Sequence, residues 1–241
     1  MHGDDGKPQG IWGLGSDGAL TGPLNAPIPD GPAGLVPHNL RGLAPLPDGG
    51  FLAMNAYIKD TRILRFGAKD ANGAYPYLGD FATAGAAVPA LAHGYQIAIG
   101  PNGNVYASNQ DSNTVTCFAG VALPNAGQPV SLANAAGGAP GVIVPSDKTS
   151  AEGINDVRGI AFGPDGLLYV CDRGNNRVQI FKASDVGKPC ANPNGDVGKC
   201  GFVGEIHVAP QTSGGTSGTV NFSSDPRQSC LYIADLGNDV V

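Results

Sequence analysis

Short apolar runs separated by turn residues recur along the chain, and residues 157–181 (VRGIAFGPDGLLYVCDRGNNRVQIF) show this pattern most clearly. Three runs are separated by Gly-Pro-Asp-Gly at 163–166 and by Asp-Arg-Gly-Asn-Asn at 172–176. Proline fixes φ and lacks a donor, and glycine accepts positive φ, so these interruptions are turns. No run is long enough for a helix, and 177–181 alternates apolar and polar positions. The segment therefore predicts three consecutive antiparallel strands.

The same plan occurs four times: apolar run, turn, apolar run, turn, apolar run. The turn prolines of the first three copies, Pro47, Pro101 and Pro164, lie 54 and 63 residues apart. Strand-only repeats of roughly 40 to 50 residues are typical of β-propeller blades, and the longer periods here indicate insertions between copies. The four copies are residues 40–66, 95–118, 157–181 and 218–241.

Each copy needs a fourth strand to complete a blade. Candidate strands follow the first three copies at 75–82, 141–145 and 202–209, whereas the fourth copy stops at Val241 within its third strand. Residues 11–15 are predicted as a lone strand that completes the last blade. We therefore predict an all-β chain, a single β-propeller domain over residues 1–241, incomplete at its C-terminus. It has three complete four-stranded antiparallel blades and part of a fourth, at 40–82, 95–145, 157–209 and 218–241.

Composition narrows the function classes. The 38 glycines and 20 prolines among 241 residues suit many short strands joined by turns. The net charge is −6 and no basic run occurs, which argues against a nucleic-acid partner. No apolar stretch approaches the roughly 20 residues that span a membrane. The polar start has no signal-peptide core, so a signal peptide was either removed or never present. Few lysines with abundant Asn, Gly, Ala and Thr favour an extracellular or periplasmic protein.

Five cysteines bear on the compartment. Cys190 and Cys200 enclose ANPNGDVGK, a loop of turn formers. We predict a disulfide between them, which fits an oxidising compartment. A metal pair is the alternative, although no CxxC motif or Cys/His cluster supports it. Cys117, Cys171 and Cys230 lie in or beside predicted strands, and we interpret them as buried thiols.

The repeat resembles a known family. Residues 157–181 closely resemble an NHL repeat, and 231–241 (LYIADLGNDVV) match its centre. The first two copies match more loosely, since MNAYIKDTRILRF and SNQDSNTVTCF lack the Asp-x-Gly-Asn turn. The resemblance implies an NHL-type propeller, and because such propellers are typically six-bladed, we expect a fragment of a six-bladed ring. The fold hosts protein- and RNA-binding modules, calcium-dependent lactonases and a zinc-dependent lyase, so it does not decide function.

The resemblance also places a site. It puts the linker into each first strand, and the turn between second and third strands, on one face at the mouth of the central channel. Asn109, Asp111, Asp172, Arg173 and Asn175 are expected around this mouth. The candidate ligand-binding residues at the mouth itself are His38, Arg41, His93, Tyr95, Asp156 and Arg158.

Two arginines stand out among these candidates. Arg41-Gly42-Leu43 aligns with Arg158-Gly159-Ile160, so Arg41 and Arg158 occupy equivalent positions. Metal-dependent propellers of this kind tend to carry Asn, Asp or His there, whereas arginine keeps its proton and does not ligate metals. The positions therefore predict no metal ligands. Two roles remain open for the arginines: binding a ligand, or supporting the fold by capping carbonyls or pairing with Asp156.

The pair Asp172 and Arg177 has a structural interpretation. We expect Asp172 to accept hydrogen bonds from backbone N–H groups of its own turn, and Arg177 to pair with it across the hairpin.

Two functions follow as hypotheses. The first is a secreted binding module whose channel mouth holds a small anionic molecule, a glycan or a protein, since guanidinium groups bind carboxylate and phosphate in pairs of hydrogen bonds. The second is a metal-dependent hydrolase of the lactonase or esterase kind, or a lyase, for which calcium is the expected cofactor. No serine-hydrolase, zinc-protease or P-loop motif occurs in the chain.

Overall fold

The structure is a computed structural model that describes residues 13–14, 20–21, 40–56, 61–71, 73, 75–84, 91–130, 142–144, 154–183, 201–208, 217–225 and 227–235. Within these residues the elements are strands, apart from one short 3₁₀ turn, η1 (Arg173–Asn175). The predicted all-β class is confirmed.

Three sheets have four antiparallel strands each, paired in chain order. The first contains β3 (Leu40–Pro45), β4 (Phe51–Asn55), β5 (Arg62–Phe66) and β6 (Tyr77–Thr83). The second contains β7 (Gly94–Ile99), β8 (Val105–Asn109), β9 (Thr114–Phe118) and β10 (Val142–Val144). The third contains β11 (Val157–Phe162), β12 (Leu168–Asp172), β13 (Arg177–Phe181) and β14 (Phe202–His207). A fourth sheet pairs β15 (Ser217–Phe222) with β16 (Leu231–Asp235). The predicted four-stranded blades are confirmed.

A separate two-stranded sheet lies near the N-terminus. Strand β1 (Gly13–Leu14) pairs antiparallel with β2 (Leu20–Thr21). The prediction that residues 11–15 complete the last blade is therefore wrong. Pairing with a strand close in sequence closes only a short loop, which costs less entropy than pairing with the far end of the chain.

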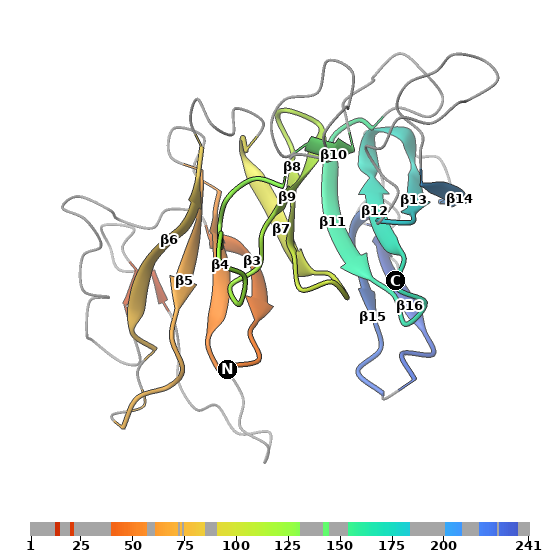
Figure 1. Ribbon diagram of the computed structural model, residues 1–241. Helices are drawn as coiled ribbons and strands as arrows, with labels where there is room; N and C mark the ends of the chain where they lie inside the picture. Colours follow the sequence, from red (N-terminus) through yellow and green to blue (C-terminus); the bar gives the residue numbers. More distant parts are fainter. Residues whose placement is uncertain are drawn as a thin grey trace.

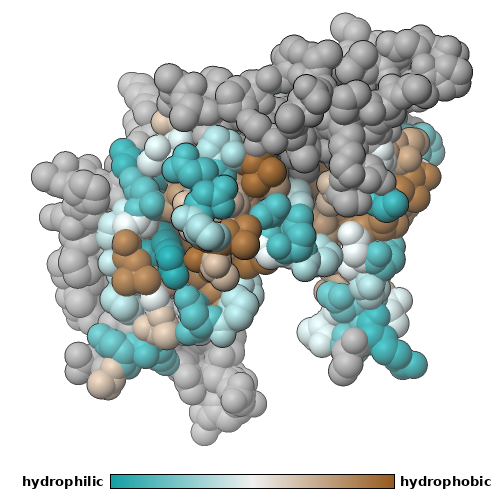
Figure 2. Space-filling view, viewed as in Figure 1, coloured by the Kyte–Doolittle hydropathy of each residue, from teal (hydrophilic) through white to brown (hydrophobic). Residues whose placement is uncertain are grey.

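The four sheets follow one another along an arc, with the first strand of each on the inner side (Figure 1). These inner strands contact one another in order, β3 with β7, β7 with β11 and β11 with β15. In Figure 2 the hairpin of the fourth sheet stands away from the first sheets, so the arc is open on this side. Radial sheets around a shared axis are the arrangement of a propeller.

The core lies between neighbouring sheets. Ile97 of the second sheet is buried against Leu52 and Met54 of the first. Ile160 and Val220, at the equivalent register in the next two sheets, are equally buried, with 1% and 0% of their surface exposed. Each sheet is thus held mainly by apolar packing on its neighbour.

Aromatic pairs repeat at the outer part of these interfaces. Tyr106 meets Phe162 of the next sheet edge to face, with ring centres 4.9 Å apart, and Tyr169 meets Phe222 in the same way at 5.0 Å. Tyr232 stands at the equivalent register of the fourth sheet and is 50% exposed. The first sheet shows the converse, since Leu43, the equivalent of Ile97, is 60% exposed. Among the described sheets, the outward faces of the first and the fourth are therefore the ones that no neighbouring sheet covers.

The cysteines differ from one another. Cys117 and Cys171 are buried, and burial raises the pKa of the Cys117 thiol to about 12. Cys230 is exposed, so its interpretation as a buried thiol is wrong; β16 begins only at the next residue. The predicted Cys190–Cys200 disulfide lies outside the described residues. No helix in the described part of the chain is long and apolar enough to cross a membrane.

Candidate binding site at the channel mouth

A repeated bulge carries the key side chains. In each of the first three sheets, the register between the inner strand and its neighbour shifts just after the inner strand begins, between Leu40 and Leu43, Gly94 and Ile97, and Val157 and Ile160. A bulge removes residues from regular pairing and re-aims their side chains. The residues that follow these strand starts are Arg41, Tyr95 and Arg158.

Steric crowding explains why a glycine follows each of the two arginines. A Cβ on Gly42 would lie 2.7 Å from the Cα of Gln96, and one on Gly159 would lie 2.5 Å from the Cα of Thr219. The inner strand of the next sheet passes too closely for any side chain. The Arg-Gly pair in the sequence therefore marks a close approach of two inner strands beside a projecting arginine.

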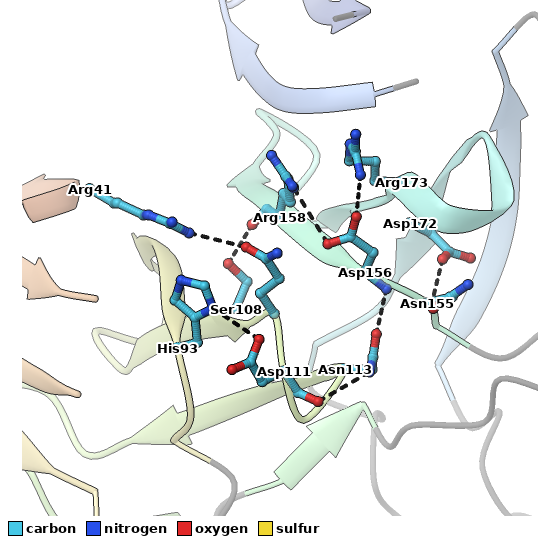
Figure 3. A network of polar contacts seen from close by, with 11 residues as sticks. Arg41, His93, Ser108, Asp111, Asn113, Asn155, Asp156, Arg158, Asp172 and Arg173 are labelled. Atoms are coloured by element: carbon cyan, nitrogen blue, oxygen red, sulfur yellow. Dashed lines mark hydrogen bonds and ion pairs between the residues drawn. The ribbon is translucent and has the colours of Figure 1, made fainter. Parts of the chain in front are cut away.

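Tyr95 connects the two arginines. The guanidinium carbon of Arg41 lies 5.0 Å from the centre of the Tyr95 ring, and that of Arg158 lies 5.3 Å from it. Both distances are within the range of a cation–π interaction. Arg41 also donates from Nη1 to Oε1 of Gln110, at 3.1 Å, and Figure 3 shows it reaching from the first sheet toward the second. Side chains of three sheets thus meet at one point.

A carboxylate lies beside this group. One oxygen of Asp156 lies 3.5 Å from Nε of Arg158, and the other accepts a hydrogen bond from Nη1 of Arg173 (Figure 3). The backbone N–H of Asp156 donates to the side-chain oxygen of Asn113 in the second sheet. The three charged side chains are between 20% and 24% exposed, so water and small solutes reach them.

His93 occupies the equivalent position in the previous linker. Its φ is 50° and that of Asp156 is 49°, both in the left-handed region. Its backbone N–H donates to Oγ1 of Thr61 at 3.0 Å, just as Asp156 donates to Asn113. Nδ1 of His93 lies 2.9 Å from the Asp111 carboxylate. The two linkers are therefore anchored alike, but their side chains differ.

Ser108 joins the second and third sheets. Its hydroxyl accepts from the backbone N–H of Gln96 at 3.0 Å and donates to the backbone carbonyl of Arg158. Sequence reasoning missed Ser108 and Gln110. The signal in the sequence is a serine at a strand position where the neighbouring sheets carry Met54 and Cys171. In the structure this serine is buried. No comparable signal marks Gln110, because its partner lies 69 residues away.

The structure brings together four of the predicted mouth residues: Arg41, Tyr95, Asp156 and Arg158. His93 lies at the same end of the sheets but pairs with Asp111 (Figure 3). His38 lies outside the described residues. Their role in binding a ligand stays a prediction.

Asp172 belongs to the scaffold instead. It is fully buried and accepts hydrogen bonds from Nε of Arg177 at 2.7 Å and Nε2 of Gln179 at 2.9 Å. It also accepts from the side chain of Asn175 and from the backbone N–H of Asn155, at 2.8 Å. The pairing with Arg177 was predicted. The prediction that Asp172 accepts backbone N–H groups of its own turn is wrong, because its backbone donor is Asn155 in the preceding linker.

Metal-binding side chains do not cluster at this end of the described sheets. Among the described residues, no three His, Cys, Asp or Glu side chains gather as a metal site requires. The positions where metal-dependent propellers tend to place ligands hold Arg41, Tyr95, Arg158 and Gly218.

Comparison with known proteins agrees with this fold. Residues 155–181 match the family model described as NHL repeat. The chain carries an NHL repeat. The resemblance predicted from the sequence is confirmed, and the NHL segment covers β11, β12 and β13, including Asp156 and Arg158. No curated protein matches the sequence.

Solved propellers resemble the NHL-containing chain in structure. A candidate 6-phosphogluconolactonase from Bacteroides uniformis is 20% identical, with a TM-score of 0.51, over 93% of this chain and 56% of its own. A chain of a nidogen/laminin complex is 15% identical, with a TM-score of 0.51, over 94% of this chain and 66% of its own. Virginiamycin B lyase from Staphylococcus aureus is 12% identical, with a TM-score of 0.49, over 93% and 55%. The chain thus spans between about half and two thirds of their length, and the likeness shows the propeller fold.

Proposed function

We propose that this protein is a binding module whose channel-mouth face holds an anionic group, carried by a small molecule, a glycan or a protein partner. The observation that carries the proposal is the meeting of Arg41 and Arg158, from two different sheets, over the ring of Tyr95. Guanidinium groups bind carboxylates through paired, charge-assisted hydrogen bonds.

The local charge supports an anionic ligand. The whole chain has a net charge of −6, yet Arg158 and Arg173 share one carboxylate, that of Asp156, and Arg41 lies over the same tyrosine ring as Arg158. Unbalanced positive charge in a partly enclosed site attracts anions and raises their local concentration.

The location and the kind of partner are parts of the same proposal. An extracellular or periplasmic location is proposed from the low lysine content and from the predicted Cys190–Cys200 disulfide. The nidogen/laminin complex contains a similar propeller, so the fold is compatible with a protein partner. The calcium-dependent hydrolase is not retained as a second candidate, because no observation on the described residues favours it.

Isothermal titration tests the proposal. The purified protein is titrated with citrate, gluconate, inorganic phosphate and heparin, with glucose as a neutral control. We expect at least one anion to bind, and to bind more weakly as salt is added, because the attraction is electrostatic. Arg41→Ala and Arg158→Ala should each weaken that binding about tenfold or more.

Arg65→Ala is the matched control. Arg65 pairs with Asp48 at 3.4 Å beside the turn between β3 and β4, at the other end of the sheet. Its removal changes the net charge equally but leaves the mouth intact. Equal losses in all three variants, or no binding of any anion by the wild-type protein, would refute the proposal. Binding abolished by a calcium chelator would favour the hydrolase hypothesis.

A further inference from the structure

We infer that the Asp156 carboxylate occupies the place of the ligand, and that the ligand is a carboxylate which displaces it. The inference rests on the proposed function and adds the chemical class of the ligand and the residue that competes with it. Asp156 then sets the apparent affinity of the mouth.

The geometry around Asp156 indicates a carboxylate. Each of its two oxygens faces a different guanidinium, Oδ1 that of Arg158 and Oδ2 that of Arg173. A ligand carboxylate has the same two oxygens in one plane and can repeat both contacts. Sulfate and phosphate can also offer two oxygens to guanidinium groups. A carboxylate is favoured because a carboxylate already fills this place in the structure.

An incoming carboxylate can replace Asp156, because it restores the hydrogen bond to Nη1 of Arg173 that Asp156 gives up. The contact of Asp156 with Arg158 is 3.5 Å, at the limit of a hydrogen bond, and the Asp156 side chain is 24% exposed. The backbone of Asp156 is anchored separately from its carboxylate, because its N–H donates to Asn113 while Oδ2 accepts from Nη1 of Arg173. Rotation of the side chain therefore moves the carboxylate into water while the linker stays fixed.

Asp172 shows the contrasting case. Its carboxylate is fully buried and accepts hydrogen bonds from Arg177, Gln179, Asn175 and a backbone N–H. Displacement would leave buried donors without an acceptor, which is costly. Of these two neighbouring aspartates, only Asp156 is placed for exchange.

The linker itself does not require a carboxylate. His93 has the same left-handed backbone and the same kind of backbone anchor, and carries an imidazole instead. The carboxylate of Asp156 is thus explained by the two arginines it faces. If the Asp156 carboxylate fills the site between the two arginines about nine-tenths of the time, the apparent affinity for an external carboxylate is about tenfold lower.

Chemical rescue by acetate tests the inference. Asp156→Gly removes the carboxylate, and glycine accepts the φ of 49° without strain. Gln228→Gly makes the same backbone change, at a φ of 46°, in the turn of the fourth sheet and is the matched control. Acetate is titrated at constant ionic strength, and binding is followed by the NMR signals of the arginine Nε–H groups and by the melting temperature.

We expect Asp156→Gly to bind acetate at least about tenfold more tightly than the wild-type protein and Gln228→Gly do. Asparagine also tolerates positive φ, so Asp156→Asn replaces the glycine variant if that variant does not fold. Its gain in acetate affinity should be smaller. An affinity within twofold of wild type, or equal gains for sulfate and acetate, would overturn the inference.

The two proposals fail separately. If the wild-type protein binds a member of the anion panel and Asp156→Gly shows no gain for acetate, only the role of Asp156 is wrong. If neither protein binds any anion, the proposed function is wrong as well.

Discussion

Single residues at this end of the molecule carry charge in two kinds of environment. Arg177 is 6% exposed at its side chain and pairs with the fully buried Asp172 and with Glu205. Arg158 is 20% exposed, and its guanidinium contacts one carboxylate oxygen of Asp156 and the ring of Tyr95. The first arrangement stabilises the blade, whereas the second leaves a cation within reach of solutes.

These environments predict different costs of mutation. Arg177→Ala should lower the free energy of unfolding by about 3–5 kcal/mol, because it leaves a buried carboxylate without its cation. Arg41→Ala and Arg158→Ala should each cost about 1 kcal/mol or less, as partly exposed cation–π and ion pairs do. Urea unfolding followed by circular dichroism measures all three. A loss of several kcal/mol in Arg158→Ala would assign that arginine to the scaffold.

At the scale of elements, a recurring close contact joins neighbouring inner strands. Gly159 faces the backbone of Thr219, and Gly42 faces that of Gln96, with no room for a Cβ. The glycine therefore sets the spacing between blades at the point where the arginine projects. Backbone atoms cannot move aside as a flexible side chain does.

Gly159→Ala should consequently destabilise the protein by about 1–3 kcal/mol, as overpacking does. Gly204→Ala in β14 is the control, since a Cβ there meets nothing within 4 Å, and its effect should stay within about 0.5 kcal/mol. Thermal unfolding of both variants measures the difference. Equal effects would show that the strands separate easily at this contact.

The hairpin turns form a second recurring element. A side-chain oxygen of Asp48, Asn102, Asp165 and Asp225 accepts the backbone N–H two residues later, at 2.9 to 3.1 Å. This local contact explains why the sequence pattern predicts the turns. The fourth turn differs, because Asp225 also accepts from the hydroxyl groups of Ser223 and Ser229.

Asp225 predicts a dependence of stability on pH. The Ser223 hydroxyl, followed by the backbone N–H groups of Ser229 and Arg227, lowers the pKa of Asp225 to about 2. The pKa in the unfolded chain is about 3.9, so the stabilisation is complete above that value and is lost as the pH falls through about 2. The difference in melting temperature between wild type and Asp225→Asn should be constant above about pH 5 and shrink between about pH 4 and 2.

Ser223→Ala supplies the control for this assignment. It removes the largest cause of the shift, so the pKa of Asp225, followed by carbon-detected NMR, should rise toward its ordinary value. An unchanged pKa would mean that the backbone N–H groups alone hold the carboxylate.

At the scale of the whole molecule, the sheets differ in how many neighbours they have. The second and third sheets are packed on both faces, by the first sheet and the third, and by the second and the fourth. The fourth sheet packs on β11 and β12 and leaves Tyr232 half exposed. Stability should therefore be unequal along the arc in Figure 1.

Hydrogen exchange measures this inequality. Amides of β8 and β12 should exchange at least about tenfold more slowly than those of β16, because opening the middle sheets exposes two apolar interfaces. Mass spectrometry of exchanged peptides resolves these strands. Uniform protection along the chain would show that the sheets unfold as one unit.

What the sequence determined by itself is local. Strands and turns follow from periodicity and from Pro, Asp and Gly positions, and the alignment of the repeats is enough to make Arg41 and Arg158 equivalent. Only the tertiary structure decided how these arginines meet, because the contacts cross between blades. Arg41 and Gln110 are 69 residues apart, and Ser108 and Arg158 are 50 apart. No local pattern encodes such pairs, since they depend on the angle and spacing at which one sheet packs on the next.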